Sequence, residues 1–195
     1  MLRVGEISRK TYETDIKVKI DLDGKGKYNI DTGIGFFNHM LCMIAKHGIM
    51  DMDVYAKGDL DVDFHHTVED VGICIGKCIK KALGDKRGIK RYGTFFIPMD
   101  ESLSMSSVDL SGRPYLVFQG KLKNSKVGEM DTELIEEFFR AVAFNAGMTL
   151  HIKAFYGKNT HHIIESIFKS FAHALREAVS IDEKIRGTMS TKGMI

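Results

Sequence analysis

The sequence predicts an α+β protein in which one unit of roughly 90 residues occurs twice. Short motifs recur at similar spacings: Glu13 and Glu101 are 88 residues apart, and Gly58 and Gly157 are 99 apart. The segment His-His-x-x-Glu occurs at 65–69 and again, 96 residues later, at 161–165. The order of strand-like and helix-like segments is also the same in the two halves of the chain.

Hydrophobic periodicity predicts the individual elements. Ile16, Val18 and Ile20 alternate with polar residues, as in a half-buried strand. Val68 and Ile75 belong to an apolar stripe with steps of three and four, as on one face of a helix. The predicted elements are strands near 2–10, 13–21 and 26–30, a helix near 34–47, a strand near 51–58, a helix near 65–83, strands near 91–98, 102–110 and 114–119, a helix near 132–145, a strand near 149–156 and a helix near 161–179.

Each half, residues 1–90 and 91–195, is predicted to form a four-stranded sheet with two helices on one face. The two halves can then pack through the open faces of their sheets or through their helix layers. Gly72 and Gly76 lie one turn apart inside a predicted helix, where each costs ~1 kcal/mol relative to alanine. We therefore expect another element to approach this helix closely.

Composition excludes several classes of protein. Lys and Arg number 28 against 26 Asp and Glu, and this near balance gives no general case for binding nucleic acid or membranes. No apolar run approaches the ~20 residues that a membrane span needs, and the first residues lack the apolar region of a secretory signal. We expect a cytoplasmic protein in which Cys74 and Cys78 are buried, reduced thiols.

The two His-His-x-x-Glu segments predict a metal-dependent enzyme. Each segment opens a predicted helix, whose N-terminus keeps a carboxylate in the first turn ionised. Adjacent helical residues point about 100° apart, so two metals, each taking one histidine of a pair, fit better than one shared metal. A single such segment could be chance or capping, but two at equivalent places among only eight histidines favour metal. Imidazole and carboxylate without thiolate suit Mn²⁺, Fe²⁺, Co²⁺ or Zn²⁺, and octahedral coordination would favour manganese.

Two further histidines, His39 and His151, are expected to join these ligands, although they do not occupy matching positions in the repeat. His47 and His173 are not expected to do so. His47 ends a predicted helix, where an imidazolium is favourable for its own sake. His173 lies three turns beyond His162.

The sequence resembles the imidazoleglycerol-phosphate dehydratase family of histidine biosynthesis over nearly its whole length, because several motifs of that family occur in it in the same order. The resemblance rests on Tyr12-Glu13-Thr14, Phe37-Asn38-His39-Met40-Leu41, Asp63-Phe64-His65-His66-Thr67-Val68-Glu69-Asp70, Met99-Asp100-Glu101, Asp109-Leu110-Ser111-Gly112-Arg113-Pro114-Tyr115, Gly147-Met148-Thr149-Leu150-His151, His161-His162-Ile163-Ile164-Glu165 and Ser190-Thr191-Lys192-Gly193.

The resemblance implies a hydro-lyase of the EC 4.2.1.19 type, which dehydrates imidazole glycerol phosphate to imidazole acetol phosphate. It implies a duplicated fold like domain 2 of ribosomal protein S5, two Mn²⁺ ions per site, and a homo-oligomer of 24 subunits with active sites between them. The metal ligands that it implies are His39, His65, His66, Glu69, His151, His161, His162 and Glu165.

The implied reaction also needs a base and a phosphate site. The substrate's imidazole ring must accept electrons, and the two metals would hold that ring. Glu13 matches the family's acidic residue and is expected to remove the carbon-bound proton. Its repeat counterpart Glu101 is the alternative base. Either residue could instead be an ordinary exposed glutamate. Cationic side chains and a hydroxyl that match the phosphate-binding positions are Arg91, Arg113, Lys192 and Ser190.

Two residues depart from the family pattern, namely Phe64, where an acidic residue is common, and Met43, where glutamine is common. Neither is an expected ligand, but each could change how neighbouring groups orient the ligands or contact substrate.

Two other functions stay open at this point. A dinuclear metallohydrolase acting on a small phosphate-bearing substrate would need a bridging carboxylate and a metal-activated water, and few aspartates accompany the histidines. A non-enzymatic S5-like RNA-binding module or a metal-storage assembly is the third possibility. The near-neutral charge argues against RNA, and the basic stretch at 85–91 lacks interleaved aromatic residues.

Overall fold

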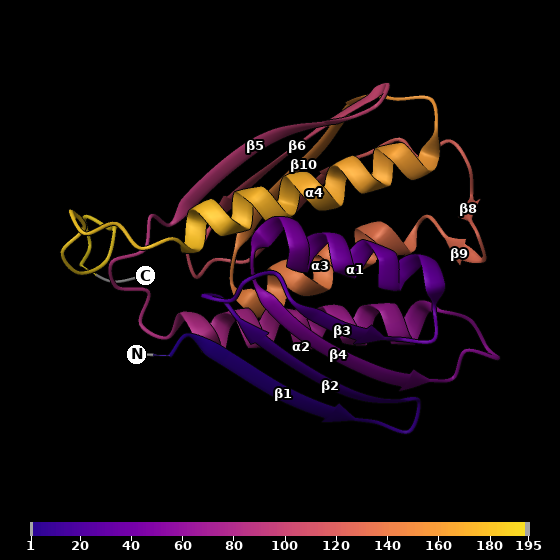
Figure 1. Cartoon of the computed structure of the whole chain (residues 1–195), viewed down its shortest axis with the longest axis horizontal. Helices are drawn as coiled ribbons and strands as arrows, with labels where there is room; N and C mark the ends of the chain where they lie inside the picture. Colours follow the sequence, from indigo (N-terminus) through magenta and orange to yellow (C-terminus); the bar gives the residue numbers. More distant parts are fainter. Residues whose placement is uncertain (1, 194–195) are drawn as a thin grey trace.

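The computed structural model describes residues 2–193 as two four-stranded sheets with four helices between them (Figure 1). Each predicted element is present, with bounds within two residues of those expected. Residues 1, 194 and 195 of the two predicted halves lie outside the described residues. The elements are β1 (Val4–Lys10), β2 (Thr14–Asp21), β3 (Tyr28–Asp31), α1 (Gly35–Gly48), β4 (Asp51–Gly58), α2 (His65–Leu83), β5 (Tyr92–Met99), β6 (Ser102–Asp109), β7 (Tyr115–Gln119), β8 (Lys126–Val127), β9 (Met130–Asp131), α3 (Leu134–Ala146), β10 (Thr149–Tyr156) and α4 (Thr160–Val179).

The two sheets have the same topology. Their strand orders are β1-β2-β4-β3 and β5-β6-β10-β7. In each, the first two pairings are antiparallel and the last is parallel. The α+β fold with a duplicated unit is therefore confirmed. The short hairpin β8–β9 was not predicted, because strands of two residues carry no periodicity.

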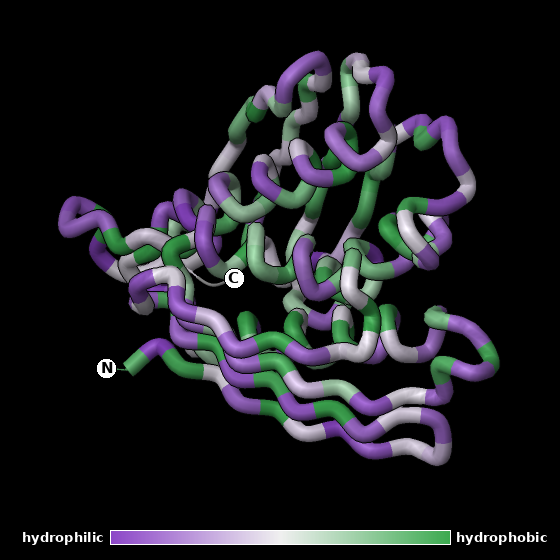
Figure 2. The backbone as a smooth tube through the Cα atoms, turned by 45° about the vertical axis from the view of Figure 1, so that its right-hand side comes forward, coloured by the Kyte–Doolittle hydropathy of each residue, from purple (hydrophilic) through white to green (hydrophobic). Residues whose placement is uncertain are grey.

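The halves pack through their helix layers and leave the outer faces of both sheets open. Helix α1 lies against α4, and α2 lies against α3 (Figure 1). Buried phenylalanines fill the helix layers. Phe37 of α1 and Phe138 of α3 meet between the halves with ring centroids 5.3 Å apart, and Phe139 of α3 packs on Phe171 of α4 within the second half at 5.2 Å. Each buried ring stabilises the fold by ~1.5–3 kcal/mol. Figure 2 shows the resulting alternation of apolar and polar residues along the strands.

Glycines in α2 permit the close packing of α2 on α3. A Cβ at Gly72 would lie 2.9 Å from the carbonyl oxygen of Phe138, and one at Gly76 would lie 2.6 Å from that of Val142. Both oxygens belong to α3, so the expected close approach of another element to this helix is confirmed.

Two further expectations concern the thiols and membranes. Cys74 and Cys78 are fully buried in α2, and the burial raises the pKa of the two thiols to about 11 and about 12. Both are free and protonated, as expected. Within residues 2–193, no helix has the combination of length and apolar character that a transmembrane segment requires.

A second pair of glycines sets the distance between strand and helix within each half. A Cβ at Gly5 of β1 would overlap the backbone carbonyl of Cys78 in α2, and a Cβ at Gly93 of β5 would overlap that of Ala174 in α4. The two glycines are 88 residues apart, so the repeat preserves this contact.

The substitution Gly93→Ala is expected to lower the free energy of unfolding by about 3 kcal/mol or more, because backbone atoms cannot move aside as a side chain can. Gly35→Ala is the control, since a Cβ there meets nothing within 4 Å. Urea denaturation of both variants measures the difference. Equal stability of the two variants would contradict the proposed close contact.

Candidate active site

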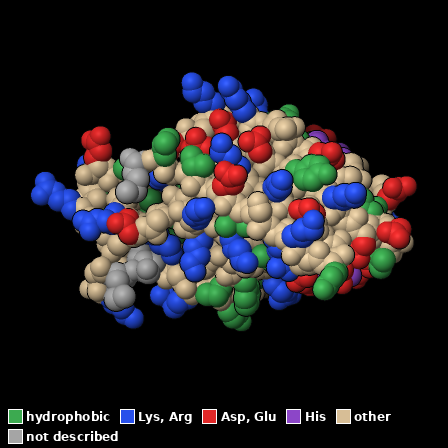
Figure 3. All heavy atoms as spheres, turned by 90° about the horizontal axis from the view of Figure 1, so that it is seen from below, with side chains coloured by type: hydrophobic (Ala, Val, Ile, Leu, Met, Phe, Trp, Pro, Cys, Tyr) green, Lys and Arg blue, Asp and Glu red, His purple; other side chains and the backbone are tan. Residues whose placement is uncertain are grey.

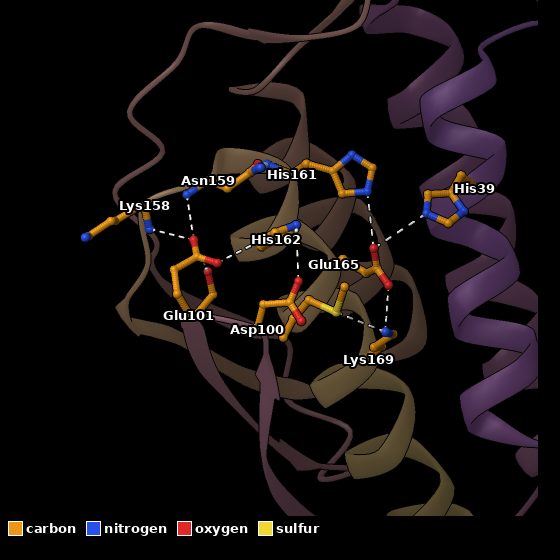
Figure 4. A network of polar contacts seen from close by, with 11 residues as sticks. His39, Asp100, Glu101, Lys158, Asn159, His161, His162, Glu165 and Lys169 are labelled. Atoms are coloured by element: carbon orange, nitrogen blue, oxygen red, sulfur yellow. Dashed lines mark hydrogen bonds and ion pairs between the residues drawn. The ribbon is translucent and has the colours of Figure 1, made fainter.

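One group of potential metal ligands joins the two halves of the chain. His39 of α1 and His161 and Glu165 of α4 have ligand atoms that all lie within 4.8 Å of one another. The Nε2 atoms of His39 and His161 lie 3.6 Å and 3.2 Å from Oε2 of Glu165 (Figure 4). Two imidazoles and one carboxylate without thiolate suit a divalent transition-metal ion, so these residues fit the kind of ion that the sequence predicts.

Glu165 is buried, yet it is held as a carboxylate. Its Oε1 accepts a hydrogen bond from Nζ of Lys169, one helical turn further along α4, at 2.6 Å. Burial pushes the pKa of Glu165 upward, but the hydrogen bond and charge of Lys169, together with His39 and His161, outweigh it and leave the pKa below its usual value. One oxygen is therefore fixed by Lys169, and the other faces the histidines (Figure 4).

His162 points away from this group. The rings of His161 and His162 have centroids 6.2 Å apart with planes at 82°, which agrees with the splay expected of adjacent helical residues. Nδ1 of His162 lies 2.7 Å from Oε2 of Glu101, in the turn between β5 and β6. Nε2 of His162 lies 3.6 Å from the carboxylate of Asp100 (Figure 4).

Glu101 is firmly tied down by hydrogen bonds. Its Oε1 accepts the backbone N–H groups of Asn159 and Lys158 at 2.7 Å and 2.9 Å. These bonds and the one from His162 hold the pKa of Glu101 far below its usual range. In return, the hydrogen bond to Glu101 raises the pKa of His162. Glu101 therefore stays ionised and has little tendency to accept a proton.

The first His-His-x-x-Glu segment has a similar splay. The rings of His65 and His66 have centroids 6.2 Å apart at 85°, and Nε2 of His65 lies 4.0 Å from Oε2 of Glu69. Nδ1 of His66 lies 2.9 Å from Oδ2 of Asp59, and this hydrogen bond raises the pKa of His66. Across residues 2–193, the group around Glu165 is the only set of three candidate ligands brought together.

His151 and Glu13 lie apart from the group around Glu165. His151 is exposed on β10, and its neighbours Leu150 and Ile152 are buried. Glu13 follows β1, and 54% of its side chain is exposed. Its Oε2 is 3.9 Å from Nδ1 of His66, too far for a hydrogen bond.

The predicted phosphate residues line one cavity of about 770 Å³ at the C-terminal end of the described chain. The guanidinium of Arg91 donates to the carboxylate of Asp109 at 2.7 Å and to the carbonyl oxygen of Met189 at 2.7 Å, which fixes residues 188–192 over the cavity. The lining of the cavity includes the four residues that the sequence predicts as a phosphate site, namely Arg91, Arg113, Ser190 and Lys192.

The cavity and the group around Glu165 lie at opposite ends of α4 (Figure 1). His161 and Val179 are 18 residues apart in this helix, which corresponds to ~27 Å at 1.5 Å per residue. In the view of Figure 3, histidine is visible only in the right-hand half, whereas Lys and Arg are spread over the whole face.

Several polar partners were not singled out from the sequence. Asp59 directly follows Gly58, an anchor of the repeat, and Lys169 is four residues after Glu165, so both had a positional signal. The ion pair between Asp109 and Arg91 had no such signal in the sequence. Phe64 and Met43, the two departures from the family pattern, are half-buried against the core.

Comparisons with known proteins agree with this arrangement. The family model described as imidazoleglycerol-phosphate dehydratase matches residues 32–175. The chain is 92% identical to imidazoleglycerol-phosphate dehydratase of Clostridium kluyveri and 64% identical to that of Acetivibrio thermocellus, with complete coverage of both chains in each case.

Two solved structures have the same fold. The dehydratase of Staphylococcus aureus matches with a TM-score of 0.84 and 44% identity, over 92% of this chain and 99% of that one. The dehydratase of Pyrococcus furiosus, solved in complex with (S)-C348, matches with a TM-score of 0.85 and 35% identity, over 97% and 100%. The chain therefore belongs to the imidazoleglycerol-phosphate dehydratase family, whose members are hydro-lyases.

Proposed function

We propose that the protein dehydrates imidazole glycerol phosphate to imidazole acetol phosphate, using two Mn²⁺ ions per active site. Membership of the dehydratase family supports the reaction. The observation that carries the metal assignment is the group formed by His39, His161 and Glu165, with ligand atoms within 4.8 Å of one another. A metallohydrolase has no comparable support, because no carboxylate in the described residues bridges two such groups.

The state of the proposed ligands favours binding of divalent ions. Glu165 is held ionised by Lys169, and the Nδ1 atoms of His66 and His162 face carboxylates. Nε2 of His162 has the carboxylate of Asp100 at 3.6 Å, beyond hydrogen-bond distance, so it can still serve as a ligand. When bound, the ions supply positive charge that stabilises the substrate's ring as an anion and assists departure of its hydroxyl group. The proposed ligands are His39, His65, His66, Glu69, His151, His161, His162 and Glu165.

We assign removal of the carbon-bound proton to Glu13. Glu101 accepts hydrogen bonds from His162, from the hydroxyl of Ser102 and from two backbone N–H groups. The bonds from His162 and the backbone depress its pKa, so that it is a poor base. The carboxylate of Glu13 accepts no hydrogen bond from the described residues and is half exposed. It can therefore turn toward a substrate carbon.

The cavity lined by Arg91, Arg113, Ser190 and Lys192 is the proposed phosphate site. Asp109 neutralises Arg91, whereas the guanidinium of Arg113 has no carboxylate partner among residues 2–193. Arg113 and Lys192 therefore supply most of the free positive charge for a phosphate.

We propose that each active site lies between subunits. The metal ligands and the phosphate cavity of one chain are separated by ~27 Å along α4, whereas only three carbons separate ring and phosphate in the substrate. The metal end of one chain must then meet the cavity of another. The family resemblance suggests an assembly of 24 subunits, with halves 1–90 and 91–195 in each.

The reaction is tested by incubating the Mn²⁺-loaded protein with imidazole glycerol phosphate. A ketone product that absorbs in alkali is expected, and Glu13→Gln is expected to lower kcat by ~10²–10⁴ with unchanged metal content, because only the base is removed. Glu6→Gln, the same change at an exposed residue of β1, is the control. Release of inorganic phosphate would overturn the dehydratase proposal, and full activity of Glu13→Gln would overturn the choice of base.

The location of the site is tested by mixing two inactive variants. His161→Ala damages only the metal ligands, and Arg113→Ala damages only the cavity. In an assembly that contains both variants, some interfaces therefore bring the intact metal ligands of one subunit against the intact cavity of another. Dissociation and joint reassembly should restore up to about a quarter of the activity, by random pairing of subunits. Mixed assemblies confirmed by mass spectrometry that stay inactive would place both parts of the site in one chain.

A further inference from the structure

The second histidine of each His-His-x-x-Glu segment has its Nδ1 against a carboxylate. His66 meets Asp59 at 2.9 Å, and His162 meets Glu101 at 2.7 Å. A neutral imidazole whose Nδ1–H donates to a carboxylate carries its free lone pair on Nε2, so the hydrogen bond decides which nitrogen can bind a metal. We propose that Asp59 and Glu101 are positioning residues that fix the tautomer and ring orientation of His66 and His162 for metal binding through Nε2. This inference rests on the proposed function, in which both histidines are ligands.

The two carboxylates are not repeat counterparts, although the histidines are. His66 and His162 are 96 residues apart, but 99 residues beyond Asp59 stands Lys158, and Glu101 is the counterpart of Glu13. The same contact is therefore made from two different places in the repeated unit. The contact in the second half is therefore not simply a copy, kept after the duplication, of the contact in the first half.

Loop length explains how the two halves reach the same contact. Six residues separate Gly58 from His65, whereas three separate Gly157 from His161. The shorter loop of the second half turns the backbone N–H groups of Lys158 and Asn159 toward Glu101. Because Asp59 lies in the longer loop of the first half, its carboxylate takes the place beside the histidine that Glu101 takes in the second.

This exchange has a consequence for Glu13. Since Asp59 already occupies Nδ1 of His66, Glu13 remains 3.9 Å away and unpaired. Glu101, its counterpart, is fixed by four hydrogen bonds. Asp59 therefore orients His66 and also leaves Glu13 free, so that one glutamate of the ancestral pair serves as the base while the other positions a ligand.

The surroundings of Asp59 argue against a purely structural role. Its side chain is 22% exposed, and its Oδ1 is buried with no hydrogen-bond partner among the described residues. A buried unpaired carboxylate oxygen destabilises a fold, so stability alone does not favour aspartate at this position.

The experiment measures Mn²⁺ affinity of the full assembled protein by competition with a chelator. Asp59→Asn and Glu101→Gln are each expected to weaken binding about 10–100-fold. A neutral amide oxygen accepts from Nδ1–H less strongly than a carboxylate, and the amide NH2 group can instead donate to a bare Nδ1, which moves the ring proton to Nε2. Asp59→Asn should leave the free energy of unfolding of the metal-free protein unchanged or higher, which a structural role would not allow. Asp61→Asn is the matched control, since Asp61 is an exposed residue of the same loop.

Neutron diffraction from metal-free crystals at about pH 9, above the ordinary imidazole pKa of ~6.5, shows the proton directly. Deuterium on Nδ1 of both His66 and His162 is expected. Deuterium on Nε2, or wild-type Mn²⁺ affinity in both carboxamide variants, would overturn the positioning role. Wild-type affinity in His66→Ala and His162→Ala would instead overturn the ligand assignment of the proposed function, which separates the two failures.

Discussion

The contact between α1 and α4 is the constraint on which the rest of the site depends. These helices belong to different halves, and only their packing places His39 beside His161 and Glu165. That packing in turn needs the helix layers to meet face to face, with glycines in α2 admitting the backbone of α3. A single unit with one sheet and two helices would carry one His-His-x-x-Glu segment but could not form this group.

Duplication preserved the backbone geometry and let the chemistry diverge. Gly5 and Gly93 keep the same strand-to-helix contact in both halves. At the equivalent core positions, Ile16 of β2 corresponds to Ser104 of β6, whose hydroxyl pairs with that of Ser166 at 2.6 Å. Polar groups can replace apolar ones in a core when each finds a partner, as these do.

The glutamates show the same divergence at the site. Glu13 and Glu101 began as equivalent residues of the repeat, and one is now fixed by hydrogen bonds while the other is free. Under the proposed function, one copy of the glutamate is the mobile base and the other positions a metal ligand.

Much of this structure could be predicted from the sequence, because periodicity reports which face of an element is buried. Strands, helices, the repeat and the splay within each histidine pair follow from spacing alone. The partner of each helix does not, and neither does the hydrogen bond from His66 to Asp59, which depends on the path of a loop. The separation of the proposed phosphate cavity from the group around Glu165 also emerged only from the direction of α4, although the four cavity residues were predicted through the family resemblance.

Under the proposed function, the two His-His-x-x-Glu segments hold two separate metal ions. Anomalous diffraction from crystals of the Mn²⁺-loaded protein tests it most directly. Two manganese peaks per chain are predicted, one beside Glu165 and one beside Glu69. A single peak per chain, or peaks remote from both carboxylates, would contradict the claim.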